Sequence, residues 1–102
     1  MADYEIKLQD GTGADTEPDL SKSARDRVRW KNEGDRGHTL VFDYQAGIWP
    51  FKEPPQLIEV EGGRSSDWFT VYDQAVERKY SYSIYPPMDT GPPDPPDVGV
   101  KT

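Results

Sequence analysis

Hydrophobic and polar side chains alternate along two neighbouring stretches of the chain, residues 26–32 and 37–44. A period of two residues is typical of β-strands that bury one face and expose the other. The segment between them, residues 33–37, carries two glycines and is typical of a turn. We therefore predict that the two stretches form an antiparallel pair. The residues that the alternation places on one face of each strand are Val28 and Trp30, then His38, Leu40 and Phe42.

The same alternation recurs along the rest of the chain. It predicts strands at residues 3–9, 56–61, 66–73 and 79–85, a short closing strand around 98–100, and a weak extended segment at 19–23. No segment shows a sustained helical period. About seven short strands with turns between them indicate one all-β domain over residues 1–102, an antiparallel Greek-key β-sandwich of seven or eight strands.

Two stretches interrupt this pattern with prolines. Residues 45–55 contain three prolines, which exclude a helix interior or a central strand, so we expect a loop that carries Trp49 and Phe51. Residues 86–96 contain six prolines in eleven positions. That composition predicts a stiff, extended loop.

The net charge of the chain indicates which kinds of molecule it can bind. Nineteen acidic residues against twelve basic ones give a net charge of −7 and a pI near 4.6. Nucleic-acid binding needs a basic face, and anionic membranes attract basic segments, so we expect neither partner. Solubility accounts for the acidity, and a protein remains as the expected partner. The composition does not indicate an oligomeric state.

The chain contains no cysteine, which excludes disulfides, thiolate metal sites and cysteine nucleophiles. No run of about 18 apolar residues predicts a membrane span. The first residues lack a basic region followed by an apolar segment, so we expect no signal peptide. A cytoplasmic protein and a trimmed exported domain both fit, so the compartment stays open.

Residues 27–32 and 37–43 together resemble the cupredoxins, especially plastocyanin-like domains. That family has a strand with a hydrophobic-x-Trp-x-Asn pattern followed by His-x-hydrophobic-Val-Phe. Residues 68–72, 79–84 and 97–102 resemble its later strands. The similarity covers roughly residues 18–44 and 66–102, and it implies a cupredoxin-type sandwich.

The resemblance also implies where a type 1 copper site would lie. In the family two histidines, a cysteine and usually a methionine hold the ion. The first histidine matches His38, but Ile84 stands at the cysteine position and Pro87 at the second histidine position. Met88 follows directly and comes too early for the usual axial ligand. A blue-copper site depends on a thiolate, so we expect no copper and no other cofactor.

Five residues are candidates for contact with a partner. The resemblance implies that His38, Tyr85 and Met88 lie at the pole where cupredoxins meet their partners, and Trp49 and Phe51 are aromatic side chains on the 45–55 loop. The alternative for His38 is a structural hydrogen bond to neighbouring backbone, and for the two aromatics it is burial over one end of the sandwich.

No nucleophile, acid and base can be argued into proximity, so we expect no catalytic residues and no enzyme. We expect a copper-free, non-catalytic binding or structural module. The alternative is a metal-binding or electron-transfer protein with a reduced ligand set centred on His38, a remnant metal site.

Overall fold

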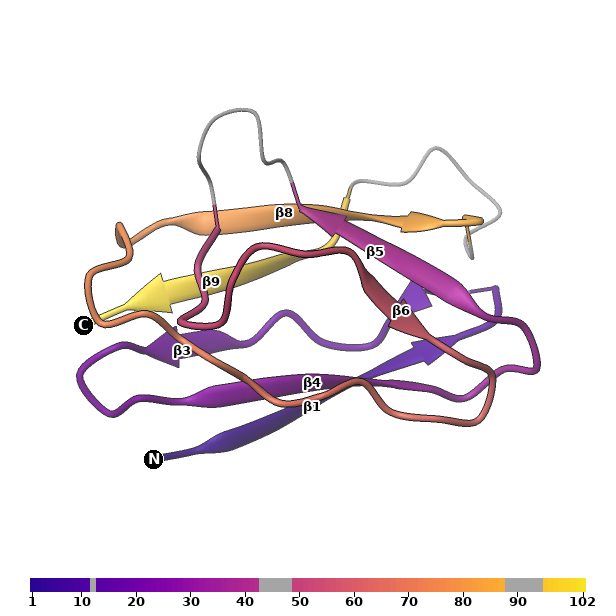
Figure 1. The fold of residues 1–102 in the computed structure, drawn as a ribbon, viewed down its shortest axis with the longest axis horizontal. Coiled ribbons are helices and arrows are strands. Elements are labelled where there is room, and N and C mark those ends of the chain that lie inside the picture. Colours follow the sequence, from indigo (N-terminus) through magenta and orange to yellow (C-terminus); the bar gives the residue numbers. More distant parts are fainter. Residues whose placement is uncertain (12, 43–48, 88–94) are drawn as a thin grey trace.

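The computed structural model describes residues 1–11, 13–42, 49–87 and 95–102, and these residues contain strands and no helix (Figure 1). The described residues therefore include no helix that is long and apolar enough to cross a membrane. The strands are β1 (Asp3–Gln9), β2 (Gly13–Ala14), β3 (Asp19–Ser21), β4 (Arg27–Asn32), β5 (His38–Phe42), β6 (Ile58–Val60), β7 (Phe69–Thr70), β8 (Lys79–Tyr85) and β9 (Asp97–Lys101).

The strands form two mixed sheets, with strand orders β2-β1-β4-β7 and β3-β9-β8-β5-β6. The all-β class predicted from the sequence is confirmed, and the two sheets are consistent with a β-sandwich. The purely antiparallel arrangement is wrong, because β1 runs parallel to β4 and β3 runs parallel to β9. Parallel neighbours need a connection that leaves the sheet, and here the chain passes through the other sheet between them.

One aromatic cluster forms the centre of the core between the sheets. The Trp30 ring of β4 is fully buried and lies edge-on against Phe42 of β5 and Tyr82 of β8, with ring centroids 6.2 and 5.5 Å apart. The indole Nε1–H donates a hydrogen bond of 3.1 Å to the hydroxyl of Tyr82. Burial raises the pKa of the Tyr82 phenol well above its ordinary range, so the hydroxyl stays protonated. These contacts join the two sheets through their largest side chains.

The predicted strand faces are confirmed for β4 and β5. Val28 and Trp30 of β4 are buried, as are Leu40 and Phe42 of β5. The predicted pairing of these strands is wrong: β4 pairs with β1 and β7, and β5 pairs with β6 and β8. The 33–37 segment is thus an arch from one sheet to the other (Figure 1). A hairpin and an arch bury the same alternate residues, so the alternation could not separate them.

The other predicted strands are found, some with the predicted bounds, one longer, and three shorter, at β3, β6 and β7. Residues 3–9 and 79–85 are strands at those limits, and the 98–100 strand extends over β9. The 66–73 segment is a strand only at β7, although its alternation is confirmed: Phe69 and Val71 are buried, whereas Tyr72 is exposed. The short β2 was not predicted, because the 10–18 segment has the composition of a loop.

The outer face of the first sheet carries ion pairs between β1 and β4. Asp3 accepts two hydrogen bonds from Arg27, 2.8 Å from Nε to Oδ1 and 2.7 Å from Nη2 to Oδ2. Arg29 and Glu5, the next partners on the same face of the sheet, form a second ion pair, with Arg29 Nη2 2.8 Å from Glu5 Oε2. Parallel register places these partners directly opposite each other.

Hydrogen bonding from Arg27 lowers the pKa of the Asp3 carboxyl below its ordinary value. A pKa lowered in the folded state means that the pair stabilises the protein above the unfolded pKa, about 3.9, and that this contribution is lost as the pH falls through the folded pKa. We expect an NMR titration of the Asp3 carboxyl carbon to show a midpoint below about 3.9 in the wild type. In an Arg27→Gln variant the midpoint should rise toward the ordinary value, and equal midpoints in both proteins would contradict the assignment.

Candidate functional site

His38 is the first residue of β5 and lies between Val60 of β6 and the end of β8. Its side chain is 5% exposed. The ring Nδ1 lies 2.8 Å from the carbonyl oxygen of Pro86. A carbonyl can only accept, so this bond needs the proton on Nδ1. The ring Nε2 is buried and has no hydrogen-bond partner among the described residues.

The groups beside His38 are not metal ligands in the positions that the resemblance implies. Leu40 pairs with Ile84 and Thr39 pairs with Tyr85, which brings the backbone of Pro86 next to the imidazole. Neither Ile84, at the cysteine position, nor Pro87, at the second histidine position, has a side chain that can donate electrons to a metal. In the described parts of the chain, no group of three or more His, Cys, Asp or Glu residues could hold an ion. The Nδ1 bond gives His38 a structural contact, tying the start of β5 to the end of β8.

Tyr85 ends β8 at the same pole and is 56% exposed (Figure 1). Pro86 and Pro87 follow it, and both are exposed. We call these three residues the Tyr85 surface. Met88, the other candidate at this pole, lies outside the described residues. The structure therefore brings two of the predicted site residues together, with His38 beneath and Tyr85 on the surface.

Trp49 and Phe51 lie near the opposite end of β5. The Phe51 ring is 3% exposed and lies edge-on to Trp30 at 6.2 Å, so it is part of the core and offers no surface to a partner. Trp49 is half-buried against Phe42, with ring centroids 5.4 Å apart, and its Nε1–H donates to the carbonyl of Glu53 at 2.6 Å. Because Phe42 and His38 are at opposite ends of β5, these aromatics do not extend the Tyr85 surface.

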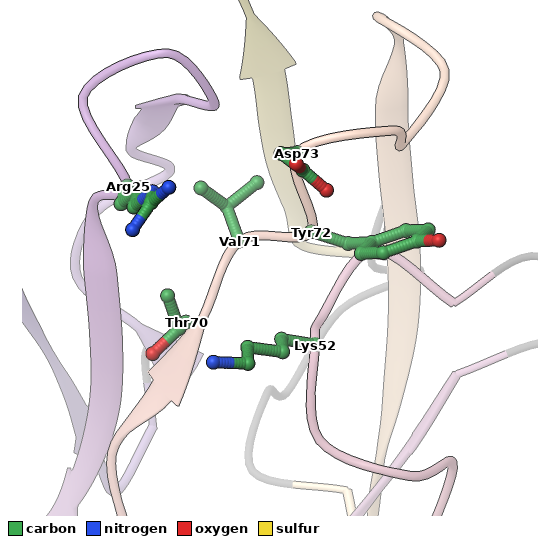
Figure 2. Close-up of a pocket in the computed structure, with 6 residues that line it drawn as sticks. All are labelled: Arg25, Lys52, Thr70, Val71, Tyr72 and Asp73. Atoms are coloured by element: carbon green, nitrogen blue, oxygen red, sulfur yellow. The ribbon is translucent and has the colours of Figure 1, made fainter.

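A second feature, which the sequence interpretation missed, is a cleft of about 200 Å³ at the other end of the molecule (Figure 2). We call it the Arg25–Lys52 cleft. The residues that line it are Arg25, Lys52, Thr70, Val71, Tyr72 and Asp73. Arg25 and Lys52 come from segments 27 positions apart, and no motif in the sequence links them. They are brought together because residues 70–72 are hydrogen-bonded to Asp26 on one side and to residues 50–52 on the other.

Comparison of the chain with protein-family models and with curated proteins gave no match.

Proposed function

We propose that this chain is a copper-free domain of Greek-key cupredoxin type and acts as a non-catalytic module that binds a protein through the Tyr85 surface. The observation that carries the proposal is the contact beneath that surface. The Nδ1 of His38 is bonded to the Pro86 carbonyl at 2.8 Å. The side chain that matches a copper ligand of the family thus holds the backbone under an exposed tyrosine.

The composition of the Tyr85 surface supports a contact with protein. Tyrosine is enriched among the residues that dominate binding energy, because it offers a large rigid ring and a polar tip. Prolines restrict the backbone before binding, so less conformational entropy is lost when a partner docks. The register of β5 with β8 fixes Tyr85 at the end of a sheet, and the buried His38 ring holds the backbone of Pro86 next to it.

The test compares two exposed side chains, Tyr85 and Val76. Tyr85 is 56% exposed, and Val76, which lies between β7 and β8, is 68% exposed. We expect affinity capture from the source organism to retain a partner on wild-type protein and on Val76→Ala, and to lose it on Tyr85→Ala. Loss of a central aromatic anchor typically costs about 2 kcal/mol or more, which is roughly a thirtyfold weaker complex. A partner retained equally by all three proteins would contradict the proposal, provided that thermal melts show each variant folded.

The second candidate is a metal-binding protein with a reduced ligand set centred on His38, and the buried Nε2 without a partner among the described residues favours it. A single imidazole is a poor site, because stable sites for divalent ions use three or four ligands. We expect isothermal titration with Cu(II) to give the same affinity for wild-type protein and for His38→Ala, and no intense thiolate-to-copper absorption band. Binding that disappears in His38→Ala would favour the metal-binding alternative.

A further inference from the structure

The Arg25–Lys52 cleft is built by three extended backbone segments that lie side by side. The Val71 N–H donates to the Asp26 carbonyl at 3.0 Å, and the Lys52 N–H donates to the Thr70 carbonyl at 2.8 Å. Residues 70–72 are therefore held between the segment that carries Arg25 and the segment that carries Lys52. Figure 2 shows the guanidinium on one side of this central segment and the Lys52 side chain on the other.

Both cations of the cleft are without a partner in the part of the chain that the structure describes. Neither the Arg25 guanidinium nor the Lys52 ammonium has an ion pair or hydrogen bond with any described residue. On the neighbouring sheet face, by contrast, Arg27 and Arg29 are each bound to a carboxylate. Two unpaired cations beside one cavity, on a chain of net charge −7, attract a negatively charged group.

The backbone of Arg25 is a second, independent observation. Its φ is 57°, and it is the one residue other than glycine with a positive φ in the described parts of the chain. The left-handed region is unfavourable for side chains with a Cβ and is normally occupied by glycine. The turn is fixed by the next residue, because the buried carboxylate of Asp26 accepts N–H bonds of 2.8 Å from both Ala2 and Ser21. An arginine at a backbone position that favours glycine points to a use for its side chain.

The remaining lining residues restrict the ligand. Tyr72 lines the cleft and is 42% exposed, so it provides apolar surface, and the Thr70 hydroxyl provides a donor. Asp73 also lines the cleft and forms no ion pair with either cation. Its negative charge repels a doubly charged phosphate more strongly than a singly charged carboxylate. The cleft thus combines two positive charges, one negative charge and an aromatic wall.

We propose that the Arg25–Lys52 cleft is a binding site for a carboxylate group, with Arg25 and Lys52 on the carboxylate oxygens and Tyr72 against the apolar part of the ligand. A small organic acid and the C-terminus of a peptide both carry this chemistry. The site lies at the end of the molecule away from the Tyr85 surface and does not depend on the function proposed for that surface.

The experiment follows backbone amide shifts of the folded protein by NMR at constant ionic strength. The probes are benzoate and an acetylated tripeptide that ends in phenylalanine with a free carboxylate, and their controls are benzamide and the same tripeptide with an amidated C-terminus. We expect saturable shifts at residues 25, 26, 52 and 70–73 with one or both carboxylates, and none with the amides. The carboxylate that binds more tightly indicates whether the ligand is a small organic acid or the C-terminus of a peptide.

Three variants then assign the binding to the two cations. Arg25→Gly and Lys52→Met should each weaken carboxylate binding at least about tenfold, the usual effect of removing a charge-assisted hydrogen bond. Arg25→Gly should keep or raise the melting temperature, because glycine tolerates the left-handed backbone. Lys7→Met, an exposed lysine on β1, is the matched control and should bind like the wild type.

Four results would overturn the proposal. They are the absence of saturable binding by both carboxylates, equal binding of the amides, equal affinities of Arg25→Gly and Lys7→Met, and tighter binding of inorganic phosphate than of benzoate. Asp73→Asn provides a further check, since removing its charge should strengthen carboxylate binding about threefold or more. Unchanged or weaker binding by this variant would contradict the role given to Asp73.

Discussion

Replacing Trp30 with alanine is expected to lower the free energy of unfolding by about 3–5 kcal/mol. The ring is fully buried, so truncation leaves a cavity that the surrounding sheets cannot close. The substitution also removes the edge-on contacts of the indole with four rings and its hydrogen bond to the Tyr82 hydroxyl. The four rings are those of Phe42, Phe51, Phe69 and Tyr82.

The matched control for this prediction is Trp68→Ala, measured by urea unfolding followed by circular dichroism. Trp68 is half-buried on the outer face of the first sheet, with the guanidinium carbons of Arg27 and Arg29 4.7 and 4.6 Å from its ring centroid. Exposed cation–π contacts contribute about 0.5–1 kcal/mol each, so this variant should lose less stability than Trp30→Ala. Equal losses would show that the core does not depend on the Trp30 ring.

Replacing Asn32 with alanine is expected to lower the free energy of unfolding by about 3 kcal/mol, since its side chain makes three hydrogen bonds, one buried and two partly buried, that contribute about 1 kcal/mol each. Its Nδ2 donates to the carbonyls of Arg36 at 2.5 Å and Val60 at 3.1 Å, and its Oδ1 accepts from the N–H of Gly34 at 2.9 Å. The side chain is fully buried. It holds the arch between β4 and β5 and joins that arch to β6, so its loss removes a donor from the buried Val60 carbonyl.

The control for Asn32→Ala is Glu59→Ala, on the exposed face of β6. A substitution at such an exposed position usually changes stability by less than about 0.5 kcal/mol. Chemical denaturation of both variants gives the comparison. A loss for Asn32→Ala no greater than that for Glu59→Ala would mean that water replaces its hydrogen bonds and that the arch does not depend on this side chain.

The two ends of the molecule differ in how far the sequence predicts them. At one end the family resemblance drew attention to His38 and Tyr85, and β5 and β8 lie side by side there. A structural hydrogen bond from His38 to the backbone was an alternative to partner contact, and the structure has such a bond, to the Pro86 carbonyl. Burial was likewise an alternative for Phe51, and Phe51 lies in the core. At the other end nothing in the sequence suggested a site. The positive φ of Arg25 is imposed by its turn and by the contacts of Asp26, not by a residue type that favours it.

The sequence by itself determined where most of the strands lie and which of their faces are buried, although it missed β2 and overextended β7. Both follow from the alternation of side chains along one strand, which is local and has a period of two. Only the tertiary structure decided which strands are neighbours. Pairing depends on backbone hydrogen bonds between distant segments, and every hydrophobic face can be buried by more than one partner. That is why β4 and β5, the two most regular predicted strands, are joined by an arch between two sheets and do not form a hairpin within one.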